Sequence, residues 1–297
     1  MRQAAAAQLA RLAAAGVRGA HPRQWYQLTT VSDPGPLIAD DAGGTLVRLS
    51  PSHVETFSKC GLRWLLEVSV GAGSVDVVRH FGTVVHAAAV LAATGAADSL
   101  IGDRIDEIWH HLDFGSAWYS EKQREQAHRM VSKLLAWHRA NPRELVSVEQ
   151  SFQARLGEVE ITGRVDRLER DGEGRAVIVD LKTGATRPPD GELDRSPQLG
   201  VYQLAVLMGA FERQGLAEPG GAELVQVGKA SYSSQVRVQR QGALPEDPEP
   251  GWARELVETV AAGMNGPVFE ARVNPGCRTC LVRSSCPVQP EGEQVTT

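Results

Sequence analysis

Two aspartates and a lysine, Asp166, Asp180 and Lys182, stand within residues 161–182. Carboxylates that are held close together repel each other unless a cation neutralises them, and their hard oxygen atoms suit Mg²⁺ or Mn²⁺. A lysine beside such a cation can orient or deprotonate a water molecule, or stabilise the charge that builds on an attacked phosphate. The three residue types therefore indicate metal-assisted phosphodiester hydrolysis. The alternative is a surface hairpin with ordinary acidic residues, which is the usual place of an isolated Asp-x-Lys.

The residues around these three predict a β-hairpin. Residues 161–166 alternate with a period of two, residues 176–179 form a short apolar run, and the polar, Gly-rich residues 171–174 lie between them. If the two strands pair antiparallel, Asp180 lies alongside Asp166, and Lys182 lies on the same face as Asp180. We therefore expect both carboxylates and the ammonium in one small volume.

Three polar residues on predicted helices are further candidates for the site. His86 lies on the apolar helix of residues 81–93, where a packed or surface histidine is the alternative to a ligand. Gln198 and Tyr202 are four positions apart on a helix predicted from Ser196 to about Arg213, so they point at the same place. The tryptophans of residues 100–139 (Trp109, Trp118 and Trp137) are expected in the core.

The four cysteines form a second candidate site. Cys277, Cys280 and Cys286 are clustered, with Pro287 after the last of them, and Cys60 lies far upstream. A cytosolic protein disfavours disulfides, which leaves zinc or an iron–sulfur cluster, and the Cys-Pro ending favours iron–sulfur. Such a site would staple the helical N-terminal part to the C-terminus. The alternative is a set of free, buried cysteines.

Composition and charge limit the possible classes of protein. The 297 residues, 42% of them hydrophobic, suffice for one large or two modest domains. A net charge of -5 argues against a protein that coats nucleic acid by bulk electrostatics. Residues 121–143 carry six Lys or Arg against two Glu, which predicts a solvated helix face or a local DNA track. The GxxxxGK[ST] phosphate loop is missing, so we expect no ATP hydrolysis by this chain.

The order of the predicted elements indicates an α/β or α+β fold with a mixed five-stranded sheet flanked by helices. Residues 1–47 are expected to be an Ala-rich helix and a linker, residues 48–288 the folded domain, and residues 289–297 a disordered tail. We find no signal-peptide pattern and no run of eighteen apolar residues. A cytoplasmic protein without a membrane span is therefore expected.

Several motifs together resemble the RecB-like branch of the PD-(D/E)xK nucleases. They are similar to the iron–sulfur nuclease domains at the C-termini of AddB, AdnA and AdnB helicase–nuclease subunits. The resemblance covers residues 48–288 and rests on the Ser-x-Ser helix leading to Cys60, GxxxH at 82–86, GRVDR at 163–167, DLKTG at 180–184, QLGVYQ at 198–203, and the cysteine triplet. It departs from the family at Gly61, where the family commonly has proline after the first cysteine.

The resemblance implies a PD-(D/E)xK core and a role for each matching residue. It implies a Mg²⁺ or Mn²⁺ ion held by His86, Asp166, Asp180 and the Leu181 carbonyl, and a [4Fe-4S] cluster held by Cys60, Cys277, Cys280 and Cys286. Lys182 would be the catalytic lysine, Gln198 and Tyr202 would complete a helix motif near the DNA, and Glu149 falls where the family often has an acid.

The resemblance also implies a biological role. The expected activity is exonuclease action on single-stranded DNA ends, in double-strand break processing and recombinational repair. The expected partners are DNA and a helicase motor or helicase–nuclease subunit, because residues 1–46 look like a helicase–nuclease junction. The alternatives are a non-catalytic DNA-binding or scaffold module, and a zinc-stapled protein unrelated to DNA.

Overall fold

The computed structural model describes residues 2–25, 46–70, 77–112, 114–184, 188–228, 235–290 and 292. The chain divides into two compact units, Met1–Leu37 and Ile38–Thr297. Within the first unit, α1 (Arg2–Ala14) confirms the predicted Ala-rich helix, and the 3₁₀ turn η1 (Pro22–Gln24) follows it. Residues 26–45 of the expected linker, and most of the expected disordered tail, lie outside the described residues.

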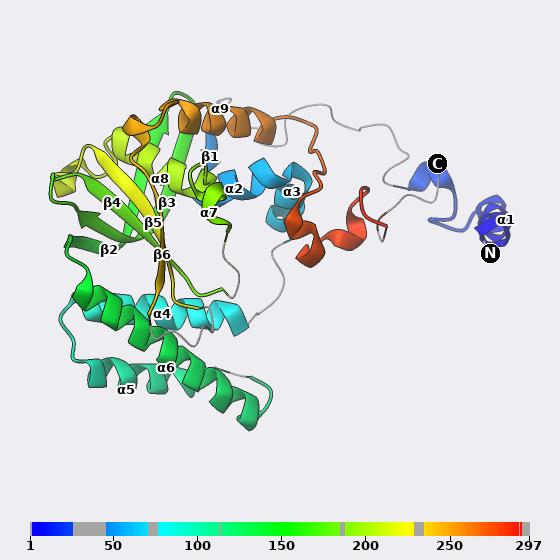
Figure 1. The fold of residues 1–297 in the computed structure, drawn as a ribbon. Helices are drawn as coiled ribbons and strands as arrows, with labels where there is room; N and C mark the ends of the chain where they lie inside the picture. The colour runs from blue at the N-terminus through cyan, green and yellow to red at the C-terminus, as the bar shows by residue number, and fades with distance from the viewer. Residues whose placement is uncertain are drawn as a thin grey trace. The chain divides into compact units, whose positions relative to one another are not determined.

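A mixed β-sheet forms the centre of the second unit (Figure 1). Its described strands are β1 (Val47–Leu49), β2 (Glu144–Leu156), β3 (Val159–Arg170), β4 (Ala176–Lys182), β5 (Pro219–Gln226) and β6 (Arg237–Gln241). The order is β1-β3-β4-β5-β6, and β2 pairs with β3 off this path. The pairs β1–β3 and β4–β5 are parallel and the others are antiparallel. The predicted α/β class is confirmed.

The predicted number of five strands is wrong, because β1 joins the sheet as a sixth among the described strands. β1 has only three residues, which is too short to show a reliable alternation of hydrophobic and polar residues. Its buried residues Val47 and Leu49 pair with β3. The strand therefore depends on the preformed edge of β3 rather than on its own sequence pattern.

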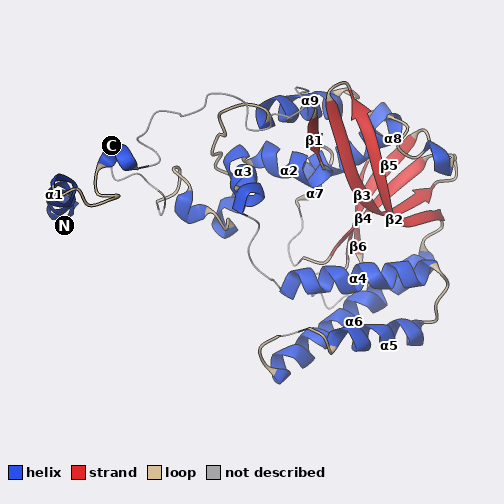
Figure 2. Ribbon diagram, turned by 180° about the vertical axis from the view of Figure 1, so that it is seen from behind, coloured by secondary structure: helices blue, strands red, loops and turns tan. Residues whose placement is uncertain are grey.

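One face of the sheet is covered by α2 (Pro51–Lys59), α8 (Pro197–Leu207) and α9 (Trp252–Met264), which share its larger core (Figure 2). Ser50 caps α2 by accepting a hydrogen bond from His53 N at 3.2 Å. The helix α8 ends at Leu207, short of the predicted Arg213. Gly209 takes a left-handed conformation (φ 80°), which terminates the helix.

Shorter helices connect these elements. The helix α3 (Gly61–Val70) follows α2, and α7 (Asp190–Leu193) precedes α8. The 3₁₀ turns η2 (Glu212–Gln214) and η3 (Leu244–Glu246) flank the last two strands, and η4 (Pro275–Thr279) and η5 (Arg283–Ser285) form the cysteine-bearing C-terminal segment. No helix in the described part of the chain is long and apolar enough to cross a membrane.

The opposite face is covered by α4 (Val77–Ala93), α5 (Asp98–Trp109) and α6 (Ala117–Ala140), which form a second core with β4 and β5 (Figure 1). Trp109 is buried and Trp137 packs against this core, as predicted. The prediction for Trp118 is wrong, because its exposed fraction is 73%. The buried face of α6 begins only at Gln123, so the first turn of the helix projects beyond the core.

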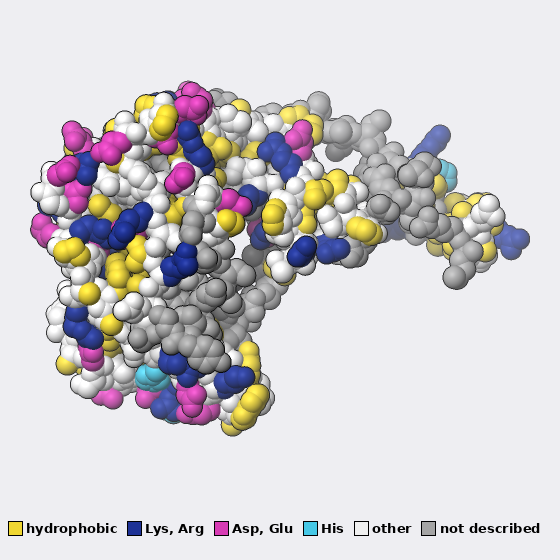
Figure 3. All heavy atoms as spheres, in the orientation of Figure 1, with side chains coloured by type: hydrophobic (Ala, Val, Ile, Leu, Met, Phe, Trp, Pro, Cys, Tyr) yellow, Lys and Arg dark blue, Asp and Glu magenta, His cyan; other side chains and the backbone are white. Residues whose placement is uncertain are grey.

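The basic run of residues 121–143 is largely neutralised by ion pairs. Its arginines pair with acidic residues on α5, on α6 itself and on the sheet: Arg124 with Asp106, Arg129 with Glu125, Arg139 with Asp98, and Arg143 with Glu169 and Glu223. On the face drawn in Figure 3, Lys and Arg side chains are interspersed with Asp and Glu. The run is thus a solvated helix face, and its last residue, Arg143, pairs with two buried glutamates. This arrangement does not favour a DNA track.

Candidate nuclease site

The β3–β4 hairpin brings Asp166 and Asp180 together, as the alternation predicted. The two strands pair antiparallel, and Leu181 N donates a hydrogen bond of 2.7 Å to Asp166 Oδ2. Lys182 Nζ lies 2.8 Å from Asp180 Oδ2. Both carboxylates and the ammonium therefore occupy one volume at the end of β4.

Two other elements complete a group of ligand atoms around Asp166. His86 on α4 places Nδ1 2.7 Å from Glu149 Oε1 on β2 and 3.5 Å from Asp166 Oδ1. One ligand atom from each of these three residues lies within 4.8 Å of the other two. This tight group contains Glu149, which adds a third carboxylate to the two that the hairpin supplies. The expected role of Asp180 and of the Leu181 carbonyl as ligands remains a prediction.

The backbone of β2 is distorted where it aims Glu149 at this group. Glu149 has φ 50°, and it is the one non-glycine residue with positive φ in the described part of the chain. The neighbouring ladder pairs, Val148–Arg167 and Gln150–Val165, put Glu149 opposite Asp166. Such a conformation costs about 1–3 kcal/mol and persists only where the surroundings enforce it. The strain is consistent with a functional requirement at this position.

A second polar network holds Asp180. Gln198 Nε2 donates 2.9 Å to Asp180 Oδ1, and Lys182 Nζ donates 3.1 Å to Gln198 Oε1. Gln198 Nε2 also lies 3.3 Å from Tyr202 Oη, which donates to the Arg164 carbonyl at 3.4 Å. As predicted, Gln198 and Tyr202 share one helix face. Gln198 forms a hydrogen bond with Asp180, and Tyr202 forms one with the β3 backbone.

The electrostatics of the site favour a bound cation. Burial, together with the negative charge of Asp180, raises the pKa of Asp166 to about 7. Burial also raises the pKa of Asp180. For Lys182, burial acts to lower the pKa, but the charge and hydrogen bond of Asp180 outweigh it and raise the pKa. Carboxylate oxygens and an imidazole are suitable ligands for a divalent cation, so the donor set fits Mg²⁺ or Mn²⁺.

Glu55 belongs to this neighbourhood, although the sequence analysis did not identify it. It lies half-buried on α2, and its charge acts to raise the pKa of Asp180 and of Lys182. Its side chain also pairs with Lys59, Oε1 to Nζ at 2.6 Å. The available signal was that Glu55 is the one acidic residue of the helix that leads to Cys60.

A close backbone crossing fixes the end of β4. Val227 N and Gly228 N both donate to the Lys182 carbonyl, at 3.0 and 3.3 Å. A Cβ atom at Gly228 would overlap the Thr183 backbone. Glycine is therefore required at position 228 for this approach, and the approach holds the backbone of Lys182 in place.

We expect Asp166→Asn to stabilise the metal-free protein at high pH. A carboxyl whose pKa rises on folding binds more protons in the folded state between about pH 4 and pH 7, so stability falls as pH rises through that window. Asparagine removes the buried charge and can still accept the Leu181 N–H. With EDTA present, the melting temperature should rise by roughly 3–6 °C at pH 8 and much less at pH 5.

Differential scanning fluorimetry of Asp166→Asn across this pH range provides the measurement. Asp103→Asn, at an exposed position of α5, serves as the matched control and should leave the melting temperature unchanged. A lower melting temperature of Asp166→Asn at pH 8 would show that the carboxylate stabilises the metal-free fold.

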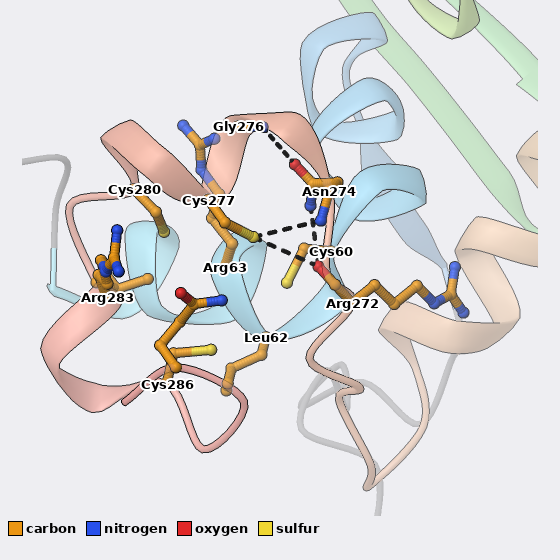
Figure 4. Close-up of a pocket in the computed structure, with 12 residues that line it drawn as sticks. Cys60, Leu62, Arg63, Arg272, Asn274, Gly276, Cys277, Cys280, Arg283 and Cys286 are labelled. Atoms are coloured by element: carbon orange, nitrogen blue, oxygen red, sulfur yellow. Dashed lines mark hydrogen bonds between the residues drawn. The ribbon is translucent and has the colours of Figure 1, made fainter. Parts of the chain in front are cut away.

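The four cysteines line one pocket (Figure 4). Cys60 caps the C-terminus of α2, and Cys277, Cys280 and Cys286 come from the C-terminal segment. All four are free thiols, and Asn274 N lies 3.3 Å from Cys277 Sγ. The pocket thus joins α2 to the C-terminal segment, as predicted for a staple.

Comparison with known proteins finds a matching family and similar solved structures. The sequence profile of the PD-(D/E)XK nuclease superfamily matches residues 48–287. The crystal structure of SSO0001 is similar, with a TM-score of 0.41 and 13% identity, over 85% of this chain and 89% of that chain. A crystal structure of a "putative exonuclease" from Eubacterium rectale has a TM-score of 0.46 and 15% identity, over 79% and 88% of the two chains. No curated protein sequence matches the chain.

The family match spans every residue of the site. It includes the helix that carries His86, the hairpin with Asp166, Asp180 and Lys182, and all four cysteines. Because the match also covers most of the chain, this protein belongs to the PD-(D/E)XK nuclease superfamily.

Proposed function

We propose that the chain is a Mg²⁺- or Mn²⁺-dependent deoxyribonuclease that degrades single-stranded DNA ends. The observation that carries this proposal is the group of His86, Glu149 and Asp166 beside the Asp180–Lys182 pair. Three acidic side chains and one lysine in a half-buried site provide both a cation site and a donor for a phosphate oxygen. This combination suits phosphodiester hydrolysis.

The residues of the chain divide this work. His86, Asp166 and Glu149 would hold the divalent cation, together with Asp180 and the Leu181 carbonyl. Such a cation, when bound, lowers the pKa of a coordinated water and neutralises charge on the phosphate. Lys182 is oriented by Asp180 and Gln198, which leaves one of its three N–H donors for the substrate. Tyr202 braces Gln198 and the β3 backbone.

The physiological role extends this proposal. We assign the enzyme to the processing of double-strand breaks in recombinational repair, in the cytoplasm, on DNA ends supplied by a helicase motor or a helicase–nuclease subunit. The support is the resemblance of residues 48–288 to helicase-associated nuclease domains. The net charge of -5 fits a nuclease that receives its substrate from a partner better than one that captures DNA alone.

The cysteine pocket is proposed to hold a structural [4Fe-4S] cluster. Four free thiols that face one pocket are suitable ligands. The Cys286-Pro287 ending favours such a cluster over zinc. The Asn274 N–H contact to Cys277 Sγ is of the kind that stabilises a thiolate ligand.

The test is degradation of labelled single-stranded DNA with Mg²⁺ or Mn²⁺, with EDTA as the metal-free control. Labels at each DNA end and a circular substrate separate the two polarities and endonuclease action. Asp180→Ala, which removes one site carboxylate, should degrade the DNA far more slowly. Equal degradation by the wild type and Asp180→Ala, or DNA binding without cleavage by the wild type, would contradict the proposal. The second result would favour a scaffold role.

A further inference from the structure

Arg164 is an exposed arginine that forms an ion pair with Glu149, one of the three candidate metal ligands. Its Nε lies 2.8 Å from Glu149 Oε2, while Oε1 of the same carboxylate contacts His86 Nδ1 at 2.7 Å. The Arg164 side chain is 63% exposed and that of Glu149 only 20%. The guanidinium therefore covers, from the solvent side, the carboxylate that completes the group.

A divalent cation and this guanidinium compete for Glu149. A cation held by His86, Glu149 and Asp166 would lie close to Arg164 and repel it, and it would also withdraw negative charge from the carboxylate that now holds the arginine. The guanidinium end of this ion pair is exposed to solvent, which screens the attraction and makes the pair weak. A bound divalent cation is thus expected to displace the guanidinium.

The backbone of Arg164 is fixed, so only its side chain can respond. Arg164 pairs with Ser151 in the β2–β3 ladder, and its carbonyl accepts the Tyr202 hydroxyl at 3.4 Å. A released guanidinium on this anchored strand stays at the edge of the site. Its planar donors match the oxygen atoms of a phosphate, and Arg is preferred over Lys where two oxygens are bound at once.

We propose that Arg164 is an exchangeable counter-ion, which pairs with Glu149 in the metal-free enzyme and with a phosphate of single-stranded DNA once a divalent cation occupies the site. This inference rests on the proposed function. It adds a residue that couples binding of the divalent cation to binding of the DNA. Since coupling between binding sites is reciprocal, the cation tightens DNA binding and DNA tightens cation binding. The enzyme would therefore engage DNA firmly only when its site is loaded.

The substitution Arg164→Gln separates this role from a structural one, because it should move two affinities in opposite directions. Removing the competing charge should tighten Mn²⁺ binding about threefold, measured by isothermal titration calorimetry without DNA. Binding of a fluorescein-labelled oligothymidylate in Ca²⁺ should weaken about fivefold, measured by anisotropy. The slope of log K against log salt should fall by about 0.7, as expected for one lost phosphate contact on a single strand.

Two further variants serve as controls. Arg155→Gln removes an exposed arginine farther along the same β2–β3 ribbon, where Nε contacts the Gly157 carbonyl at 3.1 Å, and should change neither affinity. Arg164→Lys keeps the charge and should recover part of the DNA affinity and of the salt slope.

The outcomes are distinguishable. Unchanged DNA affinity in Arg164→Gln, or weaker Mn²⁺ binding together with a lower melting temperature, would overturn the counter-ion role and leave the proposed function intact. A wild type that binds neither Mn²⁺ nor the oligonucleotide would overturn both. Opposite shifts in Arg164→Gln, with none in Arg155→Gln, would support the exchange.

Discussion

Lys182→Gln should lower the single-turnover rate of DNA cleavage by about a thousandfold, without weakening the binding of divalent cations. Lys182 is the one cation that contacts Asp180, with Nζ 2.8 Å from Oδ2, among the ion pairs of the described residues. Its ammonium is oriented by two partners, and in the proposed function its remaining donor would bind an oxygen of the attacked phosphate. Glutamine retains an N–H donor but supplies no charge as the transition state becomes more negative.

The second readout distinguishes Lys182 from a metal ligand. Loss of a neighbouring positive charge cannot weaken the electrostatic attraction of a cation, so Mn²⁺ affinity should equal or exceed that of the wild type. Removal of a ligand such as Asp166 should instead weaken Mn²⁺ binding as well as cleavage. Single-turnover assays and calorimetric titration of the same preparations provide both measurements.

The control for Lys182→Gln is Lys122→Gln. Lys122 lies on α6, with Nζ 5.3 Å from the centroid of the exposed Trp118 ring, and no described contact joins it to the site. Its replacement should leave cleavage within twofold of the wild type. A Lys182→Gln enzyme that retained more than a tenth of the wild-type rate would remove Lys182 from the chemistry.

The β3–β4 hairpin could be predicted because its determinants are local. Alternation of period two, a Gly-rich loop and an apolar run are all encoded within residues 161–182, and they fix which side chains share a face. The same holds for the pairing of Gln198 with Tyr202, which depends only on helical spacing. The structure confirms both arrangements. Neither prediction required knowledge of the rest of the fold.

Glu149 shows what local patterns could not supply. Its approach to His86 depends on packing of α4 against β2 and on a left-handed backbone conformation that glutamate disfavours. Neither is encoded in the residues next to it, and only the family resemblance drew attention to this position. Glu55 was missed for a related reason, because its position beside Asp180 and Lys182 arises from the packing of α2 on the sheet.

The surface helices show the converse error, in which composition was a poor guide to environment. Six basic residues in residues 121–143 suggested a solvated helix face or a DNA track, and acidic partners on α5, on α6 and on the sheet pair with four of them, which favours the solvated face. Trp118 was assigned to the core because of its type, although it precedes the buried stretch of α6. Pairing and exposure are tertiary properties, and single-residue preferences do not determine them.

Cys60→Ser should abolish binding of the proposed cluster and release the C-terminal segment while leaving the nuclease core folded. In the described residues after α9, the regular elements are the short 3₁₀ turns η4 and η5. The start of the C-terminal segment is anchored on α3, where Phe269 stacks on Trp64 with ring centroids 5.9 Å apart and Leu62 N donates to Glu270 O at 3.1 Å. Beyond Glu270, Asn274 Nδ2 donates to Lys59 O at 3.2 Å and Arg272 Nη1 donates to Ser58 O at 3.3 Å. A few hydrogen bonds, each worth about 1 kcal/mol, hold such a segment weakly.

The proposed cluster would hold the C-terminal segment in place, because it would bind both Cys60, next to α2, and the cysteines of that segment. A ligand that binds only the folded arrangement stabilises it by mass action, so loss of one thiolate removes that contribution. In Cys60→Ser, the broad absorbance near roughly 400 nm and the bound iron should fall to background. Limited proteolysis should then cut within residues 265–290 at least tenfold faster, with the melting temperature of the core changed much less.

The position of Cys60 makes this substitution more informative than one within the cysteine triplet. Cys60 directly follows α2, whose Val54 and Phe57 pack in the larger core, so the core can fold before the cluster forms. Ser58→Ala, on the same helix, keeps the backbone carbonyl that Arg272 contacts and should preserve both iron content and protease resistance. A Cys60→Ser protein with full iron and unchanged proteolysis would mean that Cys60 is not a ligand. If the wild type instead contained stoichiometric zinc and had no colour, the assigned metal would be zinc and not the cluster. The metal would still link α2 to the C-terminal segment.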